Sequence, residues 1–253
     1  MTKIISPKGA RIMSEQLYAI PVNDAFDSGC ECPICAMYHK LETDAVEYTM
    51  GPSYMEDDTR SQTDRYGFCA KHVMDIYNQN NRLGMAWVMK THYDKVISEV
   101  EKATPSGPAK LLKKEMGKSK LVRYLDEVNH SCFICRRIDD FFARYVDTVF
   151  VLYKNDEGFR RKFAEQKGFC TPHYELLLNN CTRYLSGTML EDFVSLINRL
   201  YLDNMKRVRD DLAWFINKFD YNYQNEPWYN ARDAVIRSMI KTNGVFKEDK
   251  PKG

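Results

Sequence analysis

One short pattern of cysteine and histidine occurs twice in this chain of 253 residues. In the first half a Cys-x-x-Cys pair is followed by Gly-Phe-Cys-x-x-His, and the second half repeats this order about one hundred positions later. Each half therefore supplies three sulfurs and one imidazole, which is a complete tetrahedral ligand set for a metal ion. The predicted ligands are Cys32, Cys35, Cys69 and His72 in the first half, and Cys132, Cys135, Cys170 and His173 in the second.

The spacing within each half favours a site closed by that half alone. There are 33 residues between Cys35 and Cys69, and 34 between Cys135 and Cys170. A helical hairpin would fill such an interval and return the chain to its start. We therefore expect a metal ion in each half to clamp the start of its first helix to the start of its third.

The ligand type favours zinc, with two ions per chain. Six of the eight cysteines belong to the repeated pattern beside a matched histidine, which disulfide bonds would not require. An iron–sulfur cluster with Cys3His ligation is the alternative, although cysteines for such clusters are more often bunched in short spacings. Four protein ligands leave no position for a reacting water, so we assign no catalytic residue.

Apolar residues recur at intervals of three and four with no alternating strand pattern, which predicts an all-α fold. The segment 189–219 carries an almost unbroken apolar stripe and is too long to be covered by one half. We expect it to lie across both halves, to bind a protein partner or to pair with a second copy. The predicted helices are 35–50, 54–66, 69–83, 85–103, 135–153, 156–166, 170–185, 189–219 and 231–241.

The predicted architecture is a duplicated helical module with two pseudo-symmetric halves, each clamped by one Cys3His metal site. A segment rich in proline and glycine separates the halves and leads into the basic stretch Lys110–Lys120. The expected divisions are an irregular segment 1–30, a first half 31–103, a linker 104–120, a second half 121–219, and an aromatic turn, helix and tail over 220–253.

Composition excludes some function classes. The formal net charge is only +2, which gives no strong attraction to nucleic acid or to an anionic membrane. No apolar run approaches the ~20 residues that a membrane span needs. Residues 1–24 contain no apolar core of a signal peptide, so we expect the protein to act in the cytoplasm.

Several longer motifs resemble those of a bacterial family of unknown function with the same duplicated cysteine and histidine pattern. The family is uncharacterised, so the resemblance implies no activity. Its members are sometimes labelled as substrate-binding components of ABC transporters, but the all-α pattern of this sequence does not fit such a component. The matching motifs are Tyr18–Asn23, Gly51–Asp58, Asn81–Gly84, Asn204–Asp211 and Glu226–Trp228.

These features favour a non-enzymatic interaction or adaptor module that contains structural zinc. Two alternatives stay open. Exchangeable Cys3His sites would suit a redox or metal sensor, or an accessory protein for the maturation of metalloenzymes. The basic stretch Lys110–Lys120 would suit a weak nucleic-acid binder.

Overall fold

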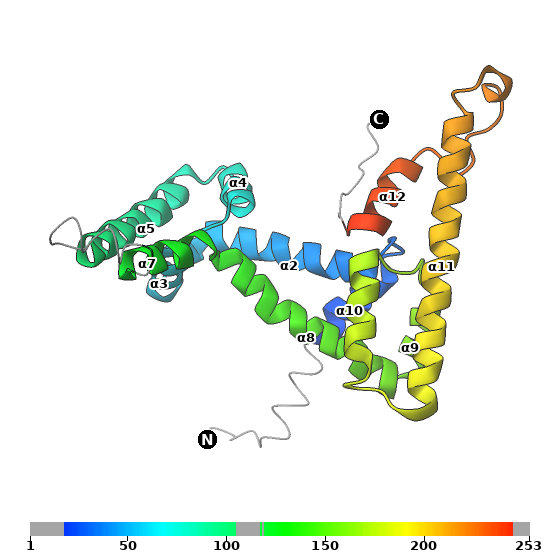
Figure 1. Ribbon diagram of the computed structural model, residues 1–253, viewed down its shortest axis with the longest axis horizontal. Helices are drawn as coiled ribbons and strands as arrows, with labels where there is room; N and C mark the ends of the chain where they lie inside the picture. The colour runs from blue at the N-terminus through cyan, green and yellow to red at the C-terminus, as the bar shows by residue number, and fades with distance from the viewer. Residues whose placement is uncertain (1–17, 105–116, 118, 245–253) are drawn as a thin grey trace. The chain divides into compact units, whose positions relative to one another are not determined.

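The computed structural model describes residues 18–104, 117 and 119–244, and these residues form helices without any strand (Figure 1). This confirms the predicted all-α fold. Besides a helix over 18–27, the described elements are α2 (Pro33–Met50), η1 (Pro52–Met55), α3 (Asp57–Tyr66), α4 (Ala70–Asn78), α5 (Arg82–Ala103), α7 (Lys120–Asn129), α8 (Phe133–Asn155), α9 (Glu157–Ala164), α10 (Thr171–Cys181), α11 (Gly187–Asn217), η3 (Tyr221–Tyr223) and α12 (Ala234–Asn243).

The chain divides into two compact units that do not follow the two halves of the sequence. Unit 1 takes residues up to His39 and from Phe142 onward, and unit 2 takes Lys40–Phe141. Both boundaries fall inside helices, because α2 begins in unit 1 and ends in unit 2, and α8 does the reverse. Each unit therefore contains parts of both predicted halves, 31–103 and 121–219.

Aromatic side chains fill the core of unit 1. Phe163 on α9 is fully buried at its centre. Its ring lies between 5.2 and 6.4 Å, centroid to centroid, from those of Phe26, Tyr153, Phe159, Phe169 and Phe193. Aromatic pairs at such distances contribute beyond the area that they bury.

The core of unit 2 is smaller and lies along α5. This helix packs against η1, α3, α4 and α7. Val88 of α5 and Ile76 of α4 have no exposed surface, and the otherwise polar α3 buries Thr59 and Thr63. Asn81 caps the start of α5, because its side chain accepts a hydrogen bond from the Gly84 amide at 2.9 Å.

Two segments differ from the sequence-based expectations. Residues 18–27 are helical, whereas we expected irregular chain around Pro21. Val22, Ala25 and Phe26 on this helix are buried in the unit 1 core, and that burial outweighs the local bias before proline. The helix α7 was also missed, although Ser119 marks its start by accepting a hydrogen bond from the Val122 amide at 3.3 Å. Residues 110–116 and 118 of the predicted basic stretch lie outside the described residues.

The long helix α11 agrees with the predicted segment 189–219 to within two residues at each end. Its apolar stripe buries Phe193, Ile197, Leu200 and Val208 in the described structure. Beyond Val208 the stripe continues without a fully buried apolar residue, and Ile216 is 68% exposed. The first part of the helix therefore belongs to the unit 1 core, and the last turns present apolar side chains at the surface.

Replacing Phe163 by alanine should lower the free energy of unfolding by ~3–5 kcal/mol, because the cavity would open at the centre of the aromatic core. Urea unfolding followed by circular dichroism measures this change. Tyr93→Ala on α5 is the control, since Tyr93 is 59% exposed and its replacement should cost little. Equal effects of the two substitutions would contradict this description of the core.

Candidate metal centres

The eight predicted ligands form two clusters, but the expected pairing within each half is wrong. Cluster 1 contains Cys32 and Cys35 from the first motif with Cys170 and His173 from the last. Cluster 2 consists of Cys69, His72, Cys132 and Cys135. Each cluster therefore joins a Cys-x-x-Cys pair from one sequence half to a Cys-x-x-His pair from the other, and each lies within one compact unit.

Helix lengths disfavour closure of each half on itself. The helix α2 has 18 residues and carries the chain ~27 Å from Cys32, at 1.5 Å per residue. The helix α3 that follows has 10 residues and can return the chain by only ~15 Å. The second half repeats this imbalance, with 23 residues in α8 and 8 in α9.

All four motifs lie at helix starts. The Cys-x-x-Cys pairs span the first turns of α2 and α8, while Cys69 and Cys170 are the N-cap residues of α4 and α10. Free amide groups and the helix dipole at such ends favour the negative charge of a thiolate. This confirms the local placement predicted for the ligands.

The glycine before each Phe-Cys pair has a backbone conformation that other residues rarely adopt. The φ angles are +55° at Gly67 and +79° at Gly168. A Cβ atom on Gly168 would also lie 2.7 Å from the Leu200 carbonyl oxygen, so the ligand loop passes directly against α11. Glycine at position 168 therefore lets the loop turn into α10 and pass close to α11.

The donor atoms of cluster 1 converge on one point. The Nδ1 atom of His173 lies 3.5, 3.3 and 3.1 Å from the sulfurs of Cys32, Cys35 and Cys170. The Cys170 sulfur is 3.8 Å from that of Cys32 and 3.5 Å from that of Cys35. The three thiols are buried and His173 is half-buried.

Cluster 2 has the same arrangement with more exposed thiols. The Nδ1 atom of His72 is 3.3 Å from each sulfur of Cys69, Cys132 and Cys135. The sulfurs of Cys69 and Cys135 are 4.0 Å apart. Cys132 and His72 are buried, whereas Cys69 and Cys135 are partly exposed.

These distances fit a single tetrahedral ion. Zinc with bonds of ~2.3 Å to sulfur and ~2.0 Å to nitrogen places two sulfurs about 3.8 Å apart, and a sulfur and a nitrogen about 3.5 Å apart. All eight cysteines of the chain are free thiols, so none of the six ligand sulfurs is consumed by a disulfide. Both clusters could therefore hold a metal ion.

Contacts among the ligands lower the pKa of one thiol in each cluster, and deprotonated thiols are the form that binds metals. Hydrogen bonds with Cys170 and Cys32 raise the pKa of Cys35, and burial raises that of Cys135. Thiol hydrogen bonds from Cys32 and Cys35 lower the pKa of Cys170 to about 4. Burial alone would raise the pKa of Cys132, but hydrogen bonds with His72 and with backbone amides lower it to about 6. Each cluster thus places one readily ionised thiol among its neighbours, and a cation would stabilise the remaining ones.

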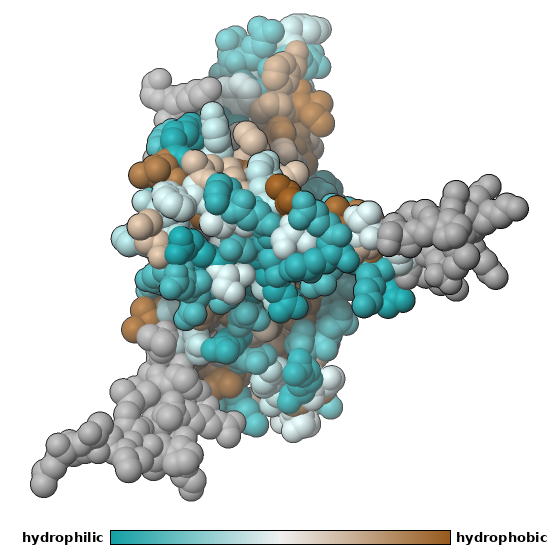
Figure 2. All heavy atoms as spheres, turned by 90° about the vertical axis from the view of Figure 1, so that its left-hand side faces the viewer, coloured by the Kyte–Doolittle hydropathy of each residue, from teal (hydrophilic) through white to brown (hydrophobic). Residues whose placement is uncertain are grey.

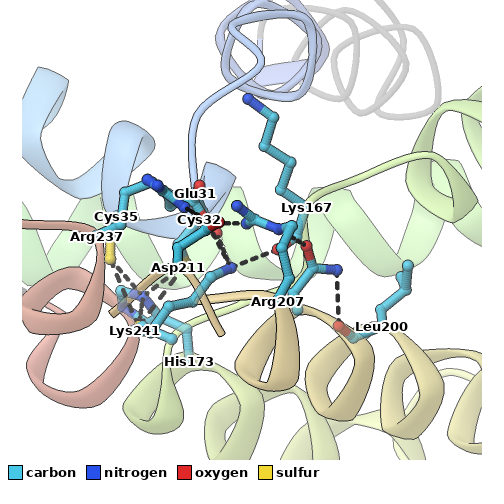
Figure 3. Close-up of polar contacts among 12 residues, drawn as sticks. Glu31, Cys32, Cys35, Lys167, His173, Leu200, Arg207, Asp211, Arg237 and Lys241 are labelled. Carbon is cyan, nitrogen blue, oxygen red and sulfur yellow. Dashed lines mark hydrogen bonds and ion pairs between the residues drawn. The ribbon is translucent and has the colours of Figure 1, made fainter. Parts of the chain in front are cut away.

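A buried lysine from α12 ties the two ligand loops of cluster 1 together (Figure 3). Lys241 is 1% exposed, and its Nζ donates hydrogen bonds to the carbonyl oxygens of Glu31, at 2.6 Å, and of Lys167. The same Nζ lies 3.1 Å from the Glu31 carboxylate, which also accepts a hydrogen bond from Arg207 on α11 at 2.6 Å. Burial lowers the pKa of Lys241, while Glu31 and Cys32 favour its charged form.

A carboxylate orients the histidine of cluster 2. Glu42 on α2 lies 3.1 Å from Nε2 of His72, on the side of the ring opposite the sulfurs. The Nζ of Lys71 lies 2.7 Å from the same carboxylate oxygen of Glu42. This amine also forms an ion pair with Asp75 at 2.8 Å. The hydrogen bond with His72, followed by the contact with Lys71, lowers the pKa of Glu42 to about 2. Glu42, His72 and Asp75 form a third group of possible metal ligands, but the lysine already supplies a cation there.

The sequence analysis missed the residues that surround the ligands. Glu31, Glu42, Arg207 and Lys241 come from separate helices or loops, and no spacing rule connects them with the cysteines. Of the basic residues next to the ligands in the sequence, Lys71 contacts Glu42. Arg136 and Arg137 instead lie over the rings of Tyr66 and Tyr48.

Comparison with known proteins identifies the family of the chain. Residues 13–249 match the model of a family of unknown function, DUF6062. The chain belongs to this family. No curated protein and no solved structure matches this DUF6062 member, so neither comparison assigns it an activity.

A hollow of 710 Å³ in unit 2 lies between α3, α5 and α7. Six of its charged side chains form ion pairs, with distances of 2.7 Å for Arg60–Asp57, 3.1 Å for Lys95–Glu99 and 3.5 Å for Arg65–Glu127. The remaining acid, Asp64, accepts a hydrogen bond from Thr91. Figure 2 looks onto this end of the molecule and shows mainly hydrophilic residues. Of the described helices, none combines the length and apolar character that crossing a bilayer requires.

Substituting Lys241 by methionine should lower the free energy of unfolding by ~2–3 kcal/mol, because two buried carbonyl groups would lose their donor. Thermal and urea unfolding of the purified protein measure the loss. Thr242→Ala, at the exposed neighbouring position on α12, should change stability by less than ~0.5 kcal/mol. A Lys241→Met protein as stable as the Thr242→Ala control would show that this buried amine does not hold the loops together.

Proposed function

We propose that both clusters hold zinc and that the ions act structurally. The observation that supports this proposal is the convergence of three sulfurs and one imidazole nitrogen in each cluster, all within 4.8 Å of one another. Zinc sites with four protein ligands are structural, since no position remains for a reacting water. The ion in each site would stabilise a fold that brings together residues far apart in the sequence.

The distances support a single ion over an iron–sulfur cluster. In such a cluster, iron and sulfide lie between the cysteine ligands and hold their sulfurs further apart. Here the closest sulfurs are 3.5 Å apart, a separation that leaves room for one ion only. Reduced thiols of this kind are maintained in the cytoplasm, which is the location that we propose.

We expect each purified chain to carry two zinc ions, and paired substitutions should reveal which ligands share an ion. Cys32→Ser with Cys170→Ser alters cluster 1 alone, so this variant should keep one zinc. Cys32→Ser with Cys69→Ser alters both clusters, so it should keep none. Elemental analysis gives the metal content, and circular dichroism checks the fold.

The opposite pattern, with one zinc in the second variant and none in the first, would restore the pairing within each sequence half. A wild-type protein purified without any metal, which also fails to bind added zinc, would reject the structural role. Iron in place of zinc would change the identity of the ion and leave the ligand assignment intact.

For the protein as a whole we propose a non-enzymatic interaction module that self-associates through the end of α11. Beyond Val208 this helix presents apolar side chains that its own unit does not bury, and Ile216 and Phe219 are 68% and 72% exposed. Charges of both signs flank this surface, including Lys206, Arg209 and Asp210. A second copy in an antiparallel arrangement would bring opposite charges and apolar residues together.

Sedimentation equilibrium should therefore detect a dimer, and Ile216→Asp with Phe219→Asp should shift it to the monomer. Asp203→Asn on the same helix is the matched control, because it removes a charge without altering the apolar end. A wild-type protein that sediments as a monomer at all concentrations would contradict self-association and leave the zinc sites unaffected.

A further inference from the structure

The two clusters have the same ligands but different surroundings. In cluster 1 all three sulfurs are buried, and in cluster 2 two of the three are partly exposed. The difference continues at corresponding positions of the duplicated helices. Glu42 follows Cys35 by seven residues and contacts His72 of cluster 2. Phe142 follows Cys135 by seven residues, and its ring centroid lies 5.8 Å from that of His173 in cluster 1.

The ligand loops are also joined differently in the two clusters. In unit 2 they contact each other directly, through hydrogen bonds from Ser131 Oγ to the Tyr66 carbonyl at 2.8 Å and from the Phe133 amide to the Gly67 carbonyl at 2.9 Å. In unit 1 the amine of Lys241 bridges the loops at the corresponding positions, Glu31 and Lys167. A helix outside the duplicated pattern therefore takes part in closing cluster 1.

The helix α12 covers cluster 1 as well as bridging it. The Gly244 carbonyl oxygen at its C-terminal end lies 3.6 Å from the Cys35 sulfur. The Lys241 carbonyl accepts a hydrogen bond from Thr171 of α10 at 3.1 Å. Arg237 holds the helix to α11 through an ion pair with Asp211 at 2.7 Å. A reagent would have to displace this helix before it could reach the buried sulfurs.

We propose that cluster 2 is an exchange site, from which a competing ligand can take the metal ion, whereas cluster 1 retains its ion. This inference rests on the proposed binding of zinc and assigns different roles to the two sites. Exchange begins when an incoming thiolate or chelator binds the ion in place of one cysteine, which can then take up a proton. Cys69 and Cys135 are the partly exposed ligands that a competitor can replace first. The competitor then leaves with the ion, and the protein thiolates take up protons from water.

Release of zinc into an excess of a coloured chelator tests the proposal on the full-length protein. Two phases are expected, each releasing one ion. The rate constant of the fast phase should exceed that of the slow phase by at least about tenfold. Iodoacetamide added during the fast phase forms a carbon–sulfur bond with each freed thiolate and releases iodide. Mass spectrometry should then find the label on Cys69 and Cys135 before it appears on Cys32, Cys35 or Cys170.

Variants assign each phase to a cluster. Glu42→Ala should weaken zinc binding at cluster 2 by roughly 10- to 100-fold and leave the slow phase unchanged, because it removes the partner of the ligand His72. Asp75→Asn is the matched control, since it leaves the contact between Glu42 and His72 in place. Lys241→Met should accelerate the slow phase alone. A protein with Cys69→Ser and Cys132→Ser should retain one zinc and show only the slow phase.

Four results would overturn the inference. Two ions that leave at one rate, or earlier labelling of cluster 1, would contradict the different roles and leave structural zinc binding intact. Acceleration of both phases by Glu42→Ala would contradict the assignment of the fast phase to cluster 2. A protein that binds no zinc would overturn both the proposed function and this inference.

Discussion

Each ligand cluster gathers three sulfurs and one imidazole nitrogen within 4.8 Å. Thiolates at such distances repel one another, and a shared cation converts that repulsion into attraction. The two ligand pairs of each cluster come from opposite halves of the sequence. An ion at either site would therefore join distant parts of the chain, and neither sequence half contains a complete site of its own.

The duplication supplies matching ligands, while the residues around the ligands make the two sites different. Lys241 on α12 bridges the loops of cluster 1, and Glu42 on α2 orients the histidine of cluster 2. A buried amine with several carbonyl acceptors rigidifies its surroundings, because any opening leaves polar groups without partners. A carboxylate on the outer nitrogen of a histidine fixes the ring and leaves the sulfurs accessible.

Local patterns predicted the helices well where periodicity was strong. The segment 189–219 corresponds to α11, and the ligand motifs lie at helix starts as expected. The helix over 18–27 was missed because its apolar face is short and contains Pro21. Lys241 could not be recognised from the sequence, since a lysine near a helix end is usually exposed. Its burial depends on acceptors from Glu31 and Lys167, which only the folded chain brings to it.

The sequence by itself determined the all-α fold and the eight ligand side chains, because helical periodicity and the spacing of Cys-x-x-Cys and Cys-x-x-His are local properties. Only the tertiary structure decided which motifs share a cluster. The interval of 33 residues after Cys35 is long enough for either pairing, so its length alone could not choose. The lengths of α2 and α3 favour the pairing across halves, because an outward helix of 18 residues is followed by one of 10 that covers little more than half of the return.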